Sequence, residues 1–160
     1  MAGAFPEPVE RVSAFLKEAG AEARIQEFPD GTHTAQDAAD AVGCELAQIV
    51  KSLVFVCGGR PVVALVPGDR RGDPQKVARA VDASEARVAK AREVEDATGF
   101  APGAVPPFPL PDVEVVLMDP AFFRHPLVWA GAGSANHVLG MAPAELARLS
   151  RARPIDVSAD

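Results

Sequence analysis

The sequence is poor in cysteine and contains no apolar segment long enough to span a membrane. Its two cysteines, Cys44 and Cys57, are too few for a disulfide framework, so a reducing cytoplasm is the expected compartment. A transmembrane helix needs about 20 consecutive apolar residues, and no membrane partner is therefore expected. Residues 1–8 also lack the basic and apolar regions of a secretory signal peptide.

Ligands for a metal ion are scarce. The histidines are scattered along the chain, and together with the cysteines they show no metal-ligand spacing (His33, His125 and His137). We therefore expect no bound metal.

The glycine-rich segments match none of the common cofactor or hydrolase motifs. The run Gly131-Ala132-Gly133 lacks the third glycine of a dinucleotide fingerprint, and residues 68–76 contain no Gly-Lys-Ser/Thr of a P-loop. Ser134 lies outside a Gly-x-Ser-x-Gly elbow, which argues against a serine triad. No cofactor is expected.

The net charge is −6, which argues against indiscriminate nucleic-acid binding. The acidic excess lies entirely within residues 1–50, with nine acidic and three basic residues, whereas residues 51–160 contain thirteen of each. Residues 70–92 contain seven basic residues against three acidic ones. This segment is either a local surface for a polyanion or a solvated helix face.

The apolar pattern predicts one α+β domain over residues 1–160, with a mixed, strongly curved sheet. Thr34 and Asp37 have capping-box spacing and predict a helix that Gly43 ends. Residues 84–97 fit either one helix or a short strand at 87–89 followed by a helix, and we favour the second. The other predicted helices span 8–19, 74–81 and 143–151, and the predicted strands span 21–28, 48–57, 60–67, 113–118, 127–130 and 137–141.

The segment 48–57 is the strand around which the chain is organised. Its residues are almost all apolar, as in a strand covered on both faces. Side-chain alternation places Lys51 on one face with Leu53, Phe55 and Cys57. An ammonium among apolar neighbours is costly unless it reaches water or an anion. The strand pattern alone favours a Lys51 side chain that extends to water from the strand end.

Two loops rich in small residues accompany this lysine. Residues 98–111 contain five prolines, and residues 131–134 read Gly-Ala-Gly-Ser. Such loops let main-chain N–H groups approach a ligand closely and can stabilise an oxyanion. Taken alone, each loop is more simply a tight turn.

Several segments, in order along nearly the whole chain, resemble the YbaK/EbsC and prolyl-tRNA synthetase editing-domain family. The loop Gly103–Pro107 matches the family's Gly-x-x-x-Pro pattern. The other matching segments are residues 32–57, 62–69, 98–100, 115–119 and 131–134. The resemblance implies a curved, barrel-like mixed sheet flanked by helices and a free-standing deacylase that clears mischarged tRNA.

The resemblance assigns the chemistry to Lys51, Gly103 and Pro107. Lys51 is similar to the family's key lysine, expected near the terminal adenosine and its phosphate or the ester. The Gly103–Pro107 loop resembles the one whose amides hold the ester carbonyl or the aminoacyl group. The implied substrate-binding residues are Thr34, Leu53, Thr98, Gly99, Ala104, Asp119, Gly131, Ala132, Gly133 and Ser134. The basic segment supplies the candidate tRNA contacts, Arg70, Arg71, Lys76 and Arg79.

This assignment fits the chemistry of an aminoacyl ester. The ester is already activated, so its hydrolysis needs a positioned water and a polarised carbonyl more than a strong nucleophile. The neighbouring ribose hydroxyl can assist proton transfer, as the family is thought to exploit. A small apolar pocket would admit only small amino-acid side chains.

The predicted function is hydrolysis of a misacylated tRNA, acting in trans, with a small amino acid on a proline-type tRNA as substrate. An aminoacyl-tRNA synthetase is a candidate partner, and the sequence favours no particular oligomeric state. One alternative is a tRNA- or nucleotide-binding module that keeps the pocket but performs no chemistry. Another is a small-molecule hydrolase or an interaction protein that uses the same pocket.

Overall fold

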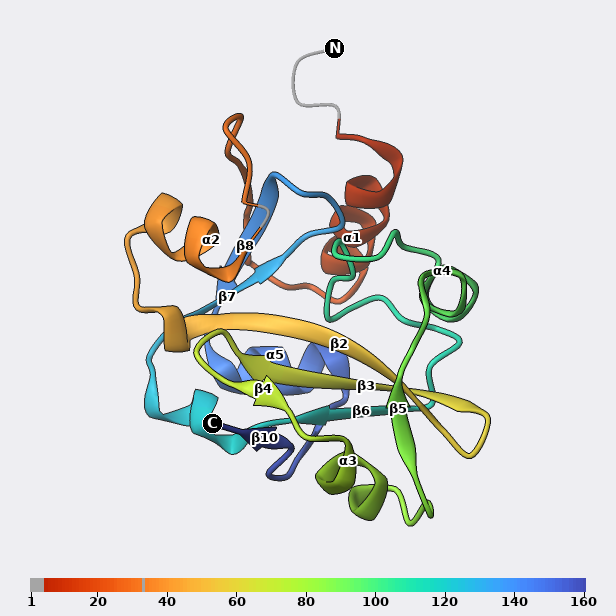
Figure 1. The fold of residues 1–160 in the computed structure, drawn as a ribbon. Coiled ribbons are helices and arrows are strands. Elements are labelled where there is room, and N and C mark those ends of the chain that lie inside the picture. Colours follow the sequence, from red (N-terminus) through yellow and green to blue (C-terminus); the bar gives the residue numbers. More distant parts are fainter. Residues whose placement is uncertain (1–4, 33) are drawn as a thin grey trace.

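The computed structural model of the chain describes residues 5–32 and 34–160 (Figure 1). The helices in these residues are α1 (Glu7–Glu18), α2 (Ala35–Val42), α3 (Pro74–Ala80), α4 (Ala91–Thr98) and α5 (Pro143–Ser150), with 3₁₀ helices η1 (Leu46–Gln48) and η2 (Pro120–Arg124). The strands are β1 (Ile25–Glu27), β2 (Ile49–Cys57), β3 (Arg60–Pro67), β4 (Arg71–Gly72), β5 (Ala86–Val88), β6 (Val115–Met118), β7 (Val128–Gly131), β8 (His137–Met141), β9 (Arg153–Pro154) and β10 (Ser158–Ala159). None of these helices is both long and apolar enough to cross a bilayer.

The main sheet is mixed and is built around the β2–β3 hairpin, which crosses the middle of the molecule in Figure 1. The strand order is β1-β8-β7-β2-β3-β6-β9, and β5 pairs with β2 off this path. The pairs β2–β7, β3–β6 and β6–β9 are parallel, whereas β2–β3 is antiparallel. The predicted mixed sheet with flanking helices is confirmed. Its strand path is open, however, with β1 and β9 at the two ends.

The central hairpin is covered on both faces, as the apolar run of β2 predicted. Val50 and Val54 of β2 belong to a core that α1, α4 and α5 also fill. Phe55 and Cys57 belong to a second core on the opposite face, which includes Val77 of α3. Alternate side chains of β3 divide between the same two cores. Consecutive residues of one strand are therefore buried in different cores, which explains the lack of polar positions.

Helix boundaries follow the capping signals in the sequence. Thr34 Oγ1 accepts the Asp37 N–H at 3.0 Å at the start of α2, and Gly43 ends that helix with a φ of 76°. Asp73 caps α3 by accepting the Gln75 N–H at 3.0 Å. The favoured interpretation of residues 84–97 is also confirmed, since β5 precedes α4.

Some strands differ from their predicted lengths. The predicted strand 21–28 is regular only at Ile25–Glu27, because β8 pairs with those three residues alone. Ala21 and Ala23 still pack against the core, as their alternation indicated. The short strands β4, β9 and β10 were not predicted. Two residues carry no periodicity, so such strands are defined by their partners, and β10 forms a small second sheet with β4.

Candidate functional site

The candidate site lies where the edge of β2 is left open. β7 pairs with β2 only at Ile49 and Val50, and β5 pairs with it only from Phe55 to Cys57. The stretch 51–53 between them has no strand partner on this edge in the described part of the chain. Val54 O accepts the Ala89 N–H across the same edge, at 2.9 Å. Since peptide groups alternate in direction along a strand, those of Ser52 also point into the opening.

A pocket of about 230 Å³ occupies this opening, and we call it the β2 pocket. Its walls come from β2, the start of α2, the loop after α4, and strands β7 and β8. Seven predicted site residues line it: Thr34, Lys51, Leu53, Gly103, Ala104, Gly131 and Ser134. The fold therefore brings together, around one cavity, segments that lie far apart in the sequence.

Lys51 does not extend into bulk water as the strand pattern alone favoured. It is half-buried, and its ammonium donates a hydrogen bond to the main-chain carbonyl of Arg70. Burial lowers the pKa of the ammonium below its ordinary value, and the nearby Asp69 carboxylate opposes that shift. An ammonium carries three donors, so two remain for a ligand in the β2 pocket.

The loop after α4 contributes two pocket-lining residues whose amides have no acceptor in the described part of the chain. Ala104 N–H is already used, because it donates to Ala101 O at 3.0 Å. Prolines carry no N–H, which excludes Pro107 as a donor. The amides of Gly103 and Val105 have no acceptor among the described residues, and both residues line the pocket. Gly103 adopts a φ of 81°, a conformation that glycine reaches without strain.

Three predicted site residues lie outside the β2 pocket, near the end of α4 and in the loop that follows. Thr98 Oγ1 accepts the Phe100 N–H at 3.1 Å, and this contact shapes the end of the helix. Gly99 is the helix cap with a φ of 74°, and its carbonyl accepts a hydrogen bond from Arg11 at 2.7 Å. Pro107 is buried. These three residues contact the pocket only through the loop that they support.

The loop from Gly131 to Ser134 contributes its two ends to the pocket. Ala132 is fully buried, and Gly133 adopts a φ of 103°. A Cβ on Gly133 would lie 2.9 Å from the carbonyl oxygen of Pro8, so the backbone of this loop packs directly on the start of α1. Only Gly131 and Ser134 therefore line the cavity.

Sequence reasoning did not identify His137 as part of this site. It is 3% exposed, and its Nδ1 lies 2.6 Å from Ser134 Oγ. The same hydroxyl lies 3.0 Å from Asn136 Oδ1 and accepts the Asn136 N–H at 3.2 Å. The imidazole Nε2 is 3.7 Å from Glu27 Oε2, too long for the hydrogen bond that orients a catalytic base. His137 does not itself line the β2 pocket, and its contact holds the pocket-lining Ser134 in place.

Trp129 lines the β2 pocket and was also not identified from the sequence. It faces Gly140 across the β7–β8 ladder, and a Cβ on Gly140 would lie 3.0 Å from the indole ring. A single tryptophan opposite a glycine was the available signal. It becomes visible only when the strand register is known.

Asp119 lies in a different cavity, of about 700 Å³, which we call the Asp119 pocket. Its side chain is 3% exposed, and its Oδ1 accepts the Ala121 N–H at 2.8 Å to cap η2. The walls of this pocket are strongly charged and include Asp69, Arg70 and Arg124. Asp119 therefore has no direct contact with the β2 pocket.

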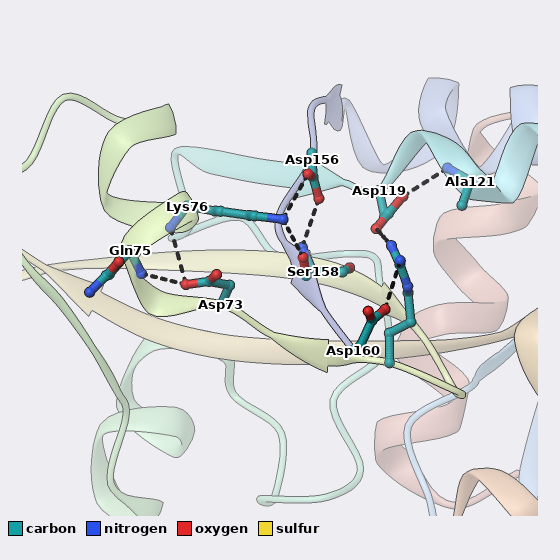
Figure 2. A network of polar contacts seen from close by, with 9 residues as sticks. Asp73, Gln75, Lys76, Asp119, Ala121, Asp156, Ser158 and Asp160 are labelled. Atoms are coloured by element: carbon teal, nitrogen blue, oxygen red, sulfur yellow. Dashed lines mark hydrogen bonds and ion pairs between the residues drawn. The ribbon is translucent and has the colours of Figure 1, made fainter.

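Three of the four candidate tRNA contacts are engaged within the protein, and Figure 2 shows one of them, Lys76, beside Asp156 and Ser158. Arg70, Arg71 and Lys76 each donate to the segment 155–160, at 3.1, 3.2 and 2.8 Å respectively. Arg79 is exposed and forms no ion pair within the described residues. Of the four, Arg79 has the charge most accessible to an external phosphate.

The described residues contain no cluster of three or more histidine, cysteine or acidic side chains suited to a metal ion. His33 lies outside the described residues. Cys44 and Cys57 are free, and burial raises the pKa of both thiols.

Comparison with known proteins now identifies the family. The model of the aminoacyl-tRNA editing domain matches residues 29–149. The chain belongs to this family. The resemblance seen in the sequence is thereby confirmed, and the β2 pocket lies in the matched part of this editing domain.

Two sequence relatives and one solved structure match the chain over most of their length. The chain is 33% identical to the uncharacterized protein YwhH of Bacillus subtilis over 85% of this chain and 87% of that protein. It is 30% identical to the multifunctional Ser/Thr-tRNA deacylase ProXp-y of Escherichia coli, over 72% of this chain and 71% of that one. A crystal structure of a proposed trans-editing enzyme for prolyl tRNA synthetase superposes with a TM-score of 0.91 and 35% identity, covering 98% of this chain and 100% of that one.

Proposed function

We propose that this editing domain hydrolyses the ester bond of a misacylated tRNA in trans, and that its substrate carries a small amino acid on a proline-type tRNA. The observation that carries the proposal is the arrangement of Lys51 and the Gly103–Val105 amides around the open edge of β2. Relatives that the chain matches over most of their length support action in trans. We also propose that residues 1–160 act as one editing domain in the cytoplasm, where tRNA is charged.

The amides and the lysine have complementary roles in this mechanism. The N–H groups of Gly103 and Val105 donate to the ester carbonyl and stabilise the negative charge that develops on its oxygen. The Lys51 ammonium binds the ribose or phosphate of the terminal nucleotide and fixes the ester beside these donors. No protein nucleophile is required, because the aminoacyl ester is already activated.

The reaction consumes one water molecule. Water adds to the carbonyl carbon, the bond from that carbon to the ribose oxygen breaks, and the ribose oxygen receives a proton. The neighbouring ribose hydroxyl relays this proton. The products are the free amino acid and the tRNA with its terminal hydroxyl restored.

Pocket size sets the proposed specificity. The β2 pocket is narrow, and Ile49, Trp129 and Val138 supply apolar walls. Such a cavity accepts the side chains of alanine, serine, threonine or cysteine more readily than larger ones. One methylene is worth only about 1–3 kcal/mol of discrimination, so closely related small amino acids are expected to overlap as substrates. An aminoacyl-tRNA synthetase is the proposed source of further tRNA selectivity.

Deacylation of a panel of charged tRNAs tests the proposal. The panel contains alanyl, seryl, threonyl and cysteinyl esters on proline-type tRNA, with correctly charged prolyl-tRNA as the control. We expect turnover of at least one small ester and slower turnover of the prolyl ester. Binding of tRNA without turnover of any ester would contradict the proposal and favour a non-catalytic binding module.

A further inference from the structure

The position of the Lys51 ammonium is set by the loop between β3 and β4. This loop spans residues 68–70, and the main-chain carbonyl of Arg70 accepts the Lys51 hydrogen bond. The side chain of Lys51 leaves β2 opposite Val66, on the face that the loop covers. A shift of the Arg70 carbonyl would therefore move the ammonium relative to the β2 pocket.

The loop is packed tightly against the start of β2. Gly68 N–H donates to Ile49 O at 2.8 Å, and a Cβ on Gly68 would lie 2.6 Å from Leu46 O. Arg70 N–H donates to Pro67 O at 3.0 Å and closes a turn. These contacts fix the loop up to Arg70, and the next constraint comes from the Arg70 side chain.

The guanidinium of Arg70 forms ion pairs with two carboxylates, those of Asp119 and Asp160. Asp160 Oδ1 lies 3.1 Å from Arg70 Nη2, but the Asp160 side chain is 97% exposed. This ion pair therefore contributes little to holding the guanidinium. Asp119 is 3% exposed, and its Oδ2 has no hydrogen-bond partner among the described residues. Arg70 Nη1 lies 3.8 Å from that oxygen. A buried carboxylate without a cation is strongly unfavourable, so Asp119 is the anchor that retains Arg70.

We propose that Arg70 is a positioning residue for Lys51. Its guanidinium is held by Asp119, and this contact keeps the carbonyl of the same residue directed at the Lys51 ammonium. Two of the three ammonium donors then remain directed at the substrate. The inference rests on the catalytic role given to Lys51 in the proposed function.

This role differs from the direct tRNA contact that the basic segment suggested for Arg70. A phosphate would have to draw the guanidinium away from the buried Asp119 carboxylate. The two roles also predict different kinetics. Loss of an Arg70–phosphate contact removes binding energy and raises KM, whereas a displaced Lys51 leaves the bound ester misaligned with the amide donors and lowers kcat.

The test uses Arg70→Met in the full chain, with Arg124→Met as the matched control. Arg124 lines the same pocket, is exposed, and forms no ion pair in the part of the chain that the structure describes. The first readout is the ¹H–¹⁵N signal of the lysine ammonium groups. Lys76 serves as the internal reference, because its ammonium is also hydrogen-bonded, to Asp156 and to Ser158 O.

We expect water exchange of the Lys51 ammonium protons to become about tenfold faster in Arg70→Met, with Lys76 unchanged, because a hydrogen bond protects these protons. Deacylation should show about a tenfold lower kcat with KM for tRNA unchanged. Arg124→Met should change neither readout. Arg70→Lys, which restores a cation near Asp119, should recover part of the protection and part of kcat.

Unchanged Lys51 exchange in Arg70→Met overturns the proposal, as does a raised KM with unchanged kcat. The ammonium readout needs no turnover, so it remains decisive if the proposed deacylation itself fails. Arg70→Met leaves the Asp119 carboxylate without a cation. If that variant does not fold, the double variant Arg70→Met with Asp119→Asn removes both charges and takes its place in the same measurements.

Discussion

Lys51 donates its ammonium hydrogen bond to the main-chain carbonyl of Arg70, nineteen residues further along the chain. This contact links the open edge of β2, where the β2 pocket lies, to the charged Asp119 pocket. The lysine is thus a fixed, half-buried cation. A cation of this kind can hold an anionic or polar group of a ligand without first losing much side-chain entropy.

Replacement of this lysine is expected to remove activity while the fold is retained. Lys51→Ala should lower the single-turnover rate of deacylation by about 10²-fold, because the ester is then no longer held in position beside the amide donors. The fold should persist, because the ammonium is costly to bury and Lys51 contributes little to either core. Thermal unfolding of Lys51→Ala checks this, with the exposed Lys17→Ala as control. Wild-type turnover in Lys51→Ala would exclude the assigned role.

Two glycines of the site loops should respond differently to alanine. At Gly103 nothing lies within 4 Å of an added Cβ, so Gly103→Ala should cost only about 1–2 kcal/mol, from its positive φ. Reorientation of its amide should lower kcat by about tenfold. At Gly133 the added Cβ would meet the backbone of Pro8, so Gly133→Ala should be the more destabilising change. Chemical denaturation together with kinetics separates these effects, and the reverse order of stabilities would contradict the structure.

Ser134 should prove to be a wall residue rather than a nucleophile. Ser134→Ala removes the hydroxyl beside His137 and should lower activity by no more than about tenfold, since the imidazole keeps its buried position. Loss of a serine nucleophile would instead lower the rate by about 10⁴-fold or more. Single-turnover deacylation distinguishes the two. A covalent acyl-enzyme trapped in the wild type would refute the assignment.

Acid should weaken the contacts that hold the segment 155–160 to Lys76 of α3. The hydrogen bond from Lys76, and next that from the Ser158 N–H, lower the pKa of Asp156 in the folded protein. A carboxyl group whose pKa is lowered by folding stabilises the folded state above its unfolded pKa of about 4, and this contribution is lost as the pH falls further. The protection factor of the Ser158 amide against hydrogen exchange should therefore decrease below about pH 4. Asp156→Asn should abolish this pH dependence, whereas Asp30→Asn, at an exposed site, should leave it intact.

Affinity for tRNA should fall steeply as salt increases. Arg79 and Arg92 are exposed and form no ion pair among the described residues, so they are the basic side chains best able to meet phosphates. Removal of each should reduce the slope of log K against log salt by about 1. Arg148→Ala is the control, because Arg148 is paired with Glu145 on α5. Binding that is insensitive to salt would exclude this surface.

The central strands and most helix ends could be predicted from the sequence because their signals are local. The apolar run of β2 required cover on both faces, and Thr34, Gly43 and Asp73 marked helix ends through their own hydrogen bonds and backbone angles. The three segments of the β2 pocket, around Lys51, Gly103 and Gly131, were identified in advance, but largely through family resemblance.

The sequence by itself determined the main helices and strands and the chemical types available, since these depend on alternation, capping and backbone freedom within a few residues. Only the tertiary structure decided that Lys51 is held by Arg70 and that Asp119 lies in a separate pocket. It also decided that three of the four candidate tRNA-contact side chains are hydrogen-bonded to the segment 155–160. Each of these facts joins residues distant in sequence. Such contacts follow from strand pairing and burial in three dimensions, and no local pattern encodes them.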